Sequence, residues 1–264
     1  MENKITFSVF TKPWKMPLPE LGRLVRGLGF TAIELPVRPG YQVEPGHVAK
    51  GLPEAARILA EQGIAIASIA GPTDEPTLAA CAEAGVPIIR VMAPIGEEGY
   101  LATVTRVQRE YQGLLPLLEK YGVRIGVQNH CDRFVCNAMG LRYLLEPFAP
   151  RYVAAVWDAA HNALQGEDPD LALDIIWPHL CMVNLKNAFW WRTNGPEAES
   201  ATWRHHWTLG RHGLASWPRV AAELLRRDYH GVLCLTAEYT EYPDNVALSK
   251  LVAEDLAYAR SLFA

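Results

Sequence analysis

Four short stretches of the sequence carry polar side chains whose types and spacing could perform chemistry. Asp158 is followed three residues later by His161, a pair of side chains suited to bind a metal or a substrate. Three further pairs share a spacing of two residues: Gln128 with His130, Asn184 with Lys186, and Thr236 with Glu238. Residues two apart on a β-strand point to the same side of a sheet. Each pair can therefore direct two polar groups toward one face.

Each of these groups also has a structural interpretation. Asp158 could be the N-cap of a helix and His161 a surface histidine. Lys186 and Glu238 could form a purely structural ion pair. An unpaired buried charge is costly, however, so several polar pairs turned to one interior favour a functional site.

The elements that position these residues follow from an alternation along the whole chain. Short apolar runs cover residues 5–10, 30–37, 64–71, 86–94, 124–130, 153–161, 180–189 and 231–240. Each run is followed by a stretch with apolar residues three or four positions apart, the pattern of an amphipathic helix. Strands that alternate with helices pair in parallel through right-handed crossovers. Eight such units predict an α/β protein, a single (β/α)8 TIM barrel over residues 1–264. The competing fold, a doubly wound open sheet, would require a glycine-rich phosphate-binding turn after the first strand. The segment SVFTKPWK at that place is not such a turn.

A TIM barrel has its active site at the carboxyl ends of its strands, where the polar pairs above lie. Glu34 and His130 also lie at strand ends, and we expect both to contact a substrate. The long segment 190–213 follows the seventh strand, and we expect it to cover the barrel mouth as a lid. Trp190, Arg192 and His206 are its predicted substrate contacts. The alternatives are that His205 and His206 decorate the surface and that residues 189–191 serve packing.

Composition excludes several classes of protein. The chain has 264 residues, of which 50% are hydrophobic, and a net charge of −4, so it can bury a large core and has no basic surface for nucleic acid. No stretch approaches the roughly 20 apolar residues of a membrane helix. The first twenty residues do not resemble a signal peptide. The five cysteines are an odd number, which argues against a disulfide framework.

We expect a cytoplasmic protein with a small-molecule partner and no nucleic-acid or membrane partner, and the sequence leaves a homo-oligomer open. A zinc site at Cys131 and Cys136 is weakly indicated, because no second cysteine pair lies nearby.

Five stretches carry a resemblance to a known family: GLGFTAIEL, IGVQNH, VAAVWDAAH, MVNLKNA and LGRHGLASWPRVAAELLRRDYHGVLCLTAE. With them the chain resembles the sugar-phosphate isomerase/epimerase superfamily, the TIM barrels similar to xylose isomerase and AP endonuclease. The resemblance covers nearly the whole length. The AP endonuclease branch has additional zinc-binding histidines after strands three and four, which SIAGP and VMAPI lack.

In that family a divalent metal is held by Glu, Asp, His and Glu on strands five to eight. The matching positions here are Gln128, Asp158, Asn184 and Thr236, so only the aspartate is kept. Glu238 could supply the missing carboxylate from two residues further on. The resemblance therefore implies a weak site for Mn or Mg at Asp158 and Glu238, helped by Gln128 or Asn184. The other interpretation is a metal-free site in which Lys186 supplies the positive charge.

The resemblance implies an enzyme of carbohydrate metabolism that isomerises or epimerises a sugar or sugar phosphate. Such a reaction needs a base next to a carbonyl and a positive group or hydrogen-bond donor for the enediolate oxygen. Glu238 is the predicted base, and Lys186 and His161 are the predicted partners for the oxygens. Three alternatives stay open: a dehydratase or lyase with His130 or His161 as acid, a non-catalytic sugar-binding barrel, and a structural subunit.

Overall fold

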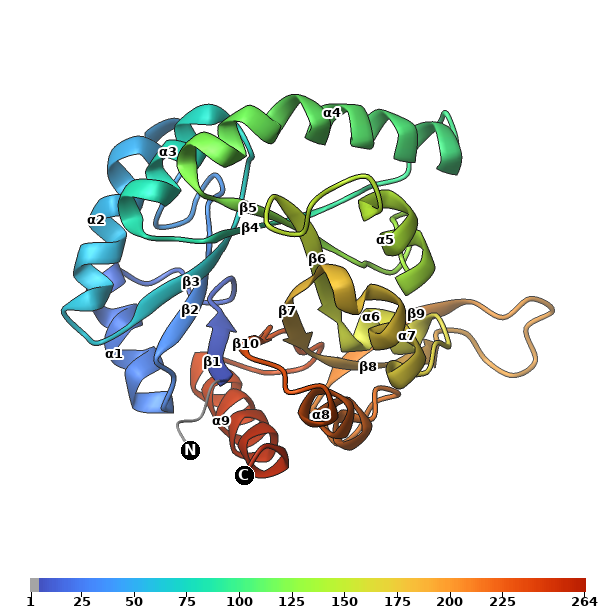
Figure 1. Ribbon diagram of the computed structural model, residues 1–264. Coiled ribbons are helices and arrows are strands. Elements are labelled where there is room, and N and C mark those ends of the chain that lie inside the picture. Colours follow the sequence, from blue (N-terminus) through green and yellow to red (C-terminus); the bar gives the residue numbers. More distant parts are fainter. Residues whose placement is uncertain (1–4) are drawn as a thin grey trace.

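Eight parallel strands close into a barrel in the computed structural model, which describes residues 5–264 (Figure 1). The barrel strands are β1 (Ile5–Phe10), β2 (Ala32–Pro36), β3 (Ala65–Ala70), β4 (Ile88–Met92), β5 (Arg124–Gln128), β6 (Val153–Asp158), β7 (Leu180–Leu185) and β10 (Gly231–Leu235). Neighbours in the chain are neighbours in the barrel, and β1 pairs with β10 to close it. The predicted single (β/α)8 barrel is confirmed. Its predicted range of 1–264 includes residues 1–4, which lie outside the described residues.

Helices surround the strands on the outside (Figure 1). They are α1 (Leu18–Leu28), α2 (Val48–Ala60), α3 (Glu75–Ala84), α4 (Tyr100–Tyr121), α5 (Ala138–Leu145), α6 (Ala159–Leu164), α7 (Pro169–Ile176), α8 (Trp217–Arg226) and α9 (Asn245–Leu262), with short 3-10 turns η1 (Pro45–His47) and η2 (Trp177–His179). Across residues 5–264, none of these helices has the length and apolar character needed to span a bilayer.

Several strands end earlier than the apolar runs predict, and the reason is local hydrogen bonding. The sixth strand stops at Asp158, whose carboxylate accepts the backbone N–H of His161 at 3.0 Å and caps α6. The N-cap interpretation is therefore right for Asp158, although His161 is buried rather than exposed. The last strand stops at Leu235, and Ala237 has a φ of +52°. Thr236 and Glu238 are thus brought to one cavity by a turn, and the expected strand alternation is wrong there.

The segment after β7 forms an antiparallel hairpin, β8 (Asn187–Arg192) and β9 (Trp203–Thr208), rather than the irregular loop that the sequence predicts. Its tip projects away from the barrel, at the right of Figure 1. The predicted strand over residues 180–189 therefore combines β7 with the start of β8.

The barrel interior is filled by a cluster of apolar side chains from six strands: Phe10, Ala70, Ile88, Val156, Met182 and Cys234. Gly126 of β5 faces this cluster. A Cβ at Gly126 would lie 2.6 Å from Cγ2 of Val156 and 3.1 Å from Cγ2 of Ile88. These β-branched side chains are stiff, so the strand has room only for glycine.

Replacing Gly126 by alanine should destabilise the barrel by about 1–3 kcal/mol, because the added methyl group overpacks the interior. Urea unfolding measures this change in the free energy of unfolding. Gly113→Ala is the matched control, since a Cβ at this position of α4 meets no atom within 4 Å. That variant should be neutral or slightly stabilising, because alanine is the better helix former. Equal stability of the Gly126→Ala variant and the wild type would contradict the close packing.

Candidate active site

A cavity of about 80 Å³ opens at the carboxyl end of the barrel. Five of the predicted site residues line it: Gln128, His130, His161, Asn184 and Glu238. The polar pairs at the strand ends therefore do meet, as the barrel requires.

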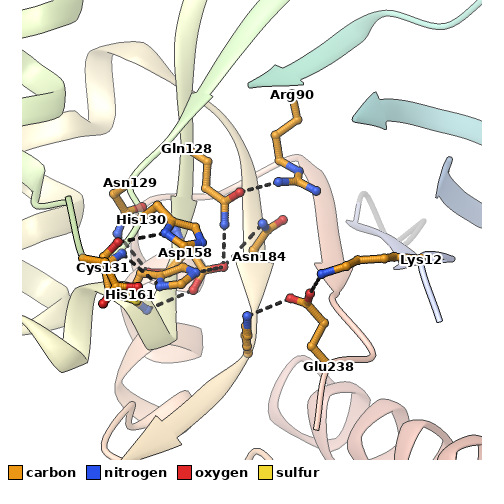
Figure 2. Close-up of polar contacts among 12 residues, drawn as sticks. Lys12, Arg90, Gln128, Asn129, His130, Cys131, Asp158, His161, Asn184 and Glu238 are labelled. Atoms are coloured by element: carbon orange, nitrogen blue, oxygen red, sulfur yellow. Dashed lines mark hydrogen bonds and ion pairs between the residues drawn. The ribbon is translucent and has the colours of Figure 1, made fainter. Parts of the chain in front are cut away.

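A chain of buried hydrogen bonds joins Arg90, Gln128 and Asp158 on strands β4, β5 and β6 (Figure 2). Arg90 of β4 donates through Nε to both Glu34 carboxylate oxygens at 2.8 and 2.9 Å, and its Nη1 donates to Oε1 of Gln128. The Gln128 amide nitrogen donates to Oδ2 of Asp158 at 2.9 Å. Glu34 is fully buried and is not among the residues that line the cavity. The structure thus places this predicted substrate contact against Arg90 instead.

Asp158 is surrounded by hydrogen-bond donors. Its Oδ1 accepts the His161 backbone N–H, and its Oδ2 accepts the amides of Gln128 and, at 3.5 Å, Asn184. Burial raises the pKa of Asp158, and the Lys186 ammonium group opposes that shift. The remaining amide oxygen of Asn184 is buried without a partner among the described residues. It is an acceptor that a substrate hydroxyl could satisfy.

Two histidines at the cavity, His130 and His161, have ring centres 4.0 Å apart and ring planes tilted by 35°. His130 Nδ1 lies 2.9 Å from the Cys131 carbonyl oxygen, which can only accept, so Nδ1 carries the hydrogen and Nε2 is a free acceptor. His161 Nδ1 accepts the Cys131 backbone N–H at 3.1 Å, so Nε2 carries the hydrogen of the neutral ring. Burial lowers the pKa of His130 and lowers that of His161 further. Both rings are therefore neutral at pH 7.

Glu238 lies between two ammonium groups. Its carboxylate oxygens are 2.7 Å from Nζ of Lys186 and 2.5 Å from Nζ of Lys12. Burial alone would raise the pKa of Glu238, but Lys186 and Lys12 outweigh it and lower the pKa to about 2. The Lys186 ammonium also lies 3.4 Å from the ring centre of Trp207. The ion pair between Lys186 and Glu238, one of the sequence alternatives, is thus present at the cavity.

The hairpin reaches the site only through its base. Trp207 contacts the ring of His161 at 5.3 Å between centres, and His205 packs on Trp207. The three predicted hairpin contacts do not line the cavity: Trp190 donates to the Leu164 carbonyl oxygen, Arg192 donates to Asn194, and His206 stacks on Phe189. Alternation along β9 puts 205 and 207 on one face and 206 on the other. The sequence would have shown this if the strand had been recognised.

Sequence reasoning missed three cationic residues that line the cavity, namely Lys12, Arg38 and Arg90. The signal for Arg90 was present, since it is a charged residue inside the otherwise apolar strand IIRVM. A charge on a barrel strand must be paired to be buried. Glu34 on β2 supplies the carboxylate that pairs with Arg90 on β4.

The profile of the xylose isomerase-like TIM barrel matches residues 23–262. The chain belongs to this family. None of the curated proteins matches the sequence significantly. This xylose isomerase-like barrel is similar in fold to the D-psicose 3-epimerase of Clostridium cellulolyticum H10 (12% identity, 98% of this chain and 99% of that chain covered, TM-score 0.75). It is also similar in fold to the 3-keto-D-glucoside 4-epimerase of E. coli (12% identity, 97% of this chain and 99% of that chain covered, TM-score 0.73). A third similar structure is a probable 3-DHS dehydratase of Bacillus anthracis (14% identity, 97% of this chain and 98% of that chain covered, TM-score 0.71).

The residues of this xylose isomerase-like barrel do not fit the divalent metal that the resemblance implies. Arg90 can only donate, so Gln128 turns its oxygen to Arg90 and its NH₂ group to Asp158. Asn184 likewise turns its NH₂ group to Asp158. Glu238 is held by two ammonium groups, whose charge repels a cation. Two other groups of potential ligands among the described residues centre on Cys131, whose pKa burial raises to about 12.

Replacing Glu34 by glutamine should destabilise the protein by about 3–5 kcal/mol, because the buried Arg90 charge loses its partner. Chemical denaturation gives the change in the free energy of unfolding. The control is Glu61→Gln, which breaks an exposed pair with Arg57 on helix α2, and it should cost less than about 1 kcal/mol. Similar losses in the two variants would show that the Glu34 and Arg90 pair is not what stabilises the barrel.

Restoring the family ligands through Gln128→Glu, Asn184→His and Thr236→Glu should create a tighter Mn²⁺ site than the wild type has. Two added carboxylates and an imidazole supply the ligand charge that a hard cation needs. Titration with Mn²⁺ after dialysis against a chelator measures the affinity. Gln165→Glu adds one carboxylate at an exposed position and should change nothing. Retention of stoichiometric metal by the dialysed wild type, with no gain in the triple variant, would overturn this interpretation.

Proposed function

We propose that this protein is an enzyme that moves a proton next to the carbonyl group of a small sugar- or polyol-derived substrate, as isomerases and epimerases do. One observation carries the proposal. A neutral imidazole with a free acceptor nitrogen and a neutral imidazole with a free N–H meet at one cavity, beside an ammonium group. Proton abstraction next to a carbonyl needs a base and a donor in this arrangement.

His130 is the proton acceptor in this proposal. Its Nε2 lone pair is free, because Nδ1 already donates to the Cys131 carbonyl oxygen. Its lowered pKa keeps the ring unprotonated at neutral pH. Glu238, which the sequence favours as the base, has a pKa of about 2 and is held by two ammonium groups. Its contribution is to position Lys186 and Lys12.

The enediolate oxygen is stabilised by two donors, the ring N–H of His161, which lies next to His130, and the ammonium group of Lys186. His161 Nε2–H is 4.0 Å from Oδ2 of Asp158, too long for a direct hydrogen bond, so this N–H is available to a substrate oxygen. Lys186 adds a positive charge close to the cavity, and a charged donor in a largely buried site stabilises developing negative charge strongly. The unpartnered oxygen of Asn184 accepts a substrate hydroxyl.

Dehydration is the second candidate, since it begins with the same proton abstraction. His130, which carries the abstracted proton as an imidazolium, can then protonate the departing hydroxyl group, while the N–H of His161 donates a hydrogen bond to the substrate. One of the proteins similar in fold is a probable dehydratase and two are epimerases. Loss of a hydroxyl group from the product distinguishes dehydration from isomerisation.

Incubation in D₂O with a panel of ketoses, aldoses and their acid and phosphate derivatives should show exchange of a substrate C–H proton, followed by NMR. His130→Asn should slow this exchange by about 100-fold or more, the usual contribution of a general base. The matched control is His47→Asn, which changes an exposed histidine of η1 and should leave the rate unchanged. Binding without any exchange would identify a non-catalytic barrel.

The pH profile identifies the base. The base must be unprotonated, and the pKa of His130 lies below its ordinary value of 6.5. The rate should therefore be constant above about pH 7 and fall in acid with a midpoint below 6.5. Glu238 as the base would leave the rate constant down to the acid unfolding of the protein, because its pKa is about 2. Full exchange activity in His130→Asn would also contradict the assignment.

A further inference from the structure

The cavity has a charge opposite to that of the protein. Lys12, Arg38 and Arg90 line it, with Glu238 as the only carboxylate among the described lining residues. The whole chain has a net charge of −4. Cations gathered in a cleft with low-dielectric walls raise the local concentration of anions.

Arg38 differs from the other cations at the site because it has no carboxylate partner within residues 5–264. Arg90 is paired with Glu34, and Lys12 is paired with Glu238. The Arg38 guanidinium lies 5.8 Å from the ring centre of Phe10, while that of Arg90 lies 4.7 Å from the same ring. An anion bound next to Arg38 would supply the partner that this guanidinium group lacks among the described residues.

We propose that the substrate carries an anionic group, a carboxylate or a phosphate, which binds to Arg38 and Lys12 at the cavity. This inference rests on the proposed function and adds the class of substrate. A guanidinium group binds either group through paired hydrogen bonds. The Lys12 side chain is 42% exposed, and its ammonium group has three donors, so it can bind a ligand while it keeps its hydrogen bond to Glu238.

The positions of the other groups agree with this assignment. Figure 2 shows Lys12 on the opposite side of the site from His130 and His161. A bound molecule can thus place its anionic group at the cations and its carbonyl group at the histidines. The cavity of about 80 Å³ has room for a small compound. A neighbouring cavity of about 240 Å³, which shares Lys12 and Glu238 and is lined by tyrosines, leaves room for a longer one.

Equilibrium binding of three non-reacting probes tests this proposal: glycerol, glycerol 3-phosphate and glycerate. They share a three-carbon skeleton and differ in having no charge, a phosphate or a carboxylate. Isothermal titration of the wild type should show that at least one anionic probe binds more tightly than glycerol. Its affinity should fall as NaCl is raised. The preferred anion then distinguishes phosphate from carboxylate.

Arg38→Gln should weaken binding of the preferred anion by about tenfold or more, because a charged hydrogen-bonding group is lost. Arg38→Lys should retain part of the affinity. Arg23→Gln is the matched control, since Arg23 is exposed on α1, and it should bind as the wild type does. Thermal unfolding of each variant shows whether its fold is intact.

Three results would overturn the proposal: no binding of either anion to the wild type, glycerol binding as tightly as the anions, or unchanged anion binding in Arg38→Gln. These results are independent of the proposed function, which is tested by proton exchange. Exchange on neutral substrates without anion binding would leave the proton-transfer function standing and remove the anion site.

Discussion

The buried ion pair between Glu34 and Arg90 determines how the rest of the site is oriented. It joins β2 to β4 inside the barrel, where an unpaired charge would be very costly. A guanidinium group can only donate, so Gln128 must offer its oxygen to Arg90 and its amide hydrogens to Asp158. Asp158 then receives hydrogen bonds at the position where a metal would otherwise bind. One ion pair thus sets the direction of the hydrogen bonds that reach Asp158.

A second charged cluster, formed by Lys12, Lys186 and Glu238, lies at the cavity itself. Lys186 and Lys12 lie on either side of Glu238, and Lys186 also lies against the face of Trp207. The positive charge that a metal would bring is therefore present as ammonium groups. Ammonium groups differ from a metal ion in that they donate directional hydrogen bonds and can lose a proton.

The fold could be predicted from the sequence because eight alternations of strand and helix leave few topologies. The meeting of Gln128, Asp158 and Asn184 could be predicted too, since the strand ends converge in any such barrel. The geometry of the loops could not be predicted from the sequence. The left-handed backbone conformation of Ala237, directly before Glu238, could not be predicted, because residues other than glycine seldom adopt it. The hairpin could not be predicted because β7 and β8 form one apolar run in the sequence. Without the hairpin, the side of β9 on which His206 lies could not be assigned.

Arg38 and Lys12 are two residues of the site that the sequence did not predict. Both follow strands as isolated basic residues, a pattern that usually marks solvent-exposed positions. Only the closure of the barrel, which pairs β1 with β2 and β10, brings them to the same cavity as Glu238. The charge of the site is therefore a property of the closed barrel rather than of any one segment.

The tautomers of His130 and His161 depend on a single residue, Cys131. The Cys131 carbonyl oxygen accepts from His130, and the Cys131 backbone N–H donates to His161. Because one residue contributes an acceptor to one ring and a donor to the other, the two neutral imidazoles must be opposite tautomers. Cys131 is fully buried, so solvent does not compete for these bonds. The backbone, which no side-chain substitution removes, therefore leaves His130 with an acceptor nitrogen at Nε2 and His161 with an N–H at Nε2, and this is the difference on which the proposed proton transfer rests.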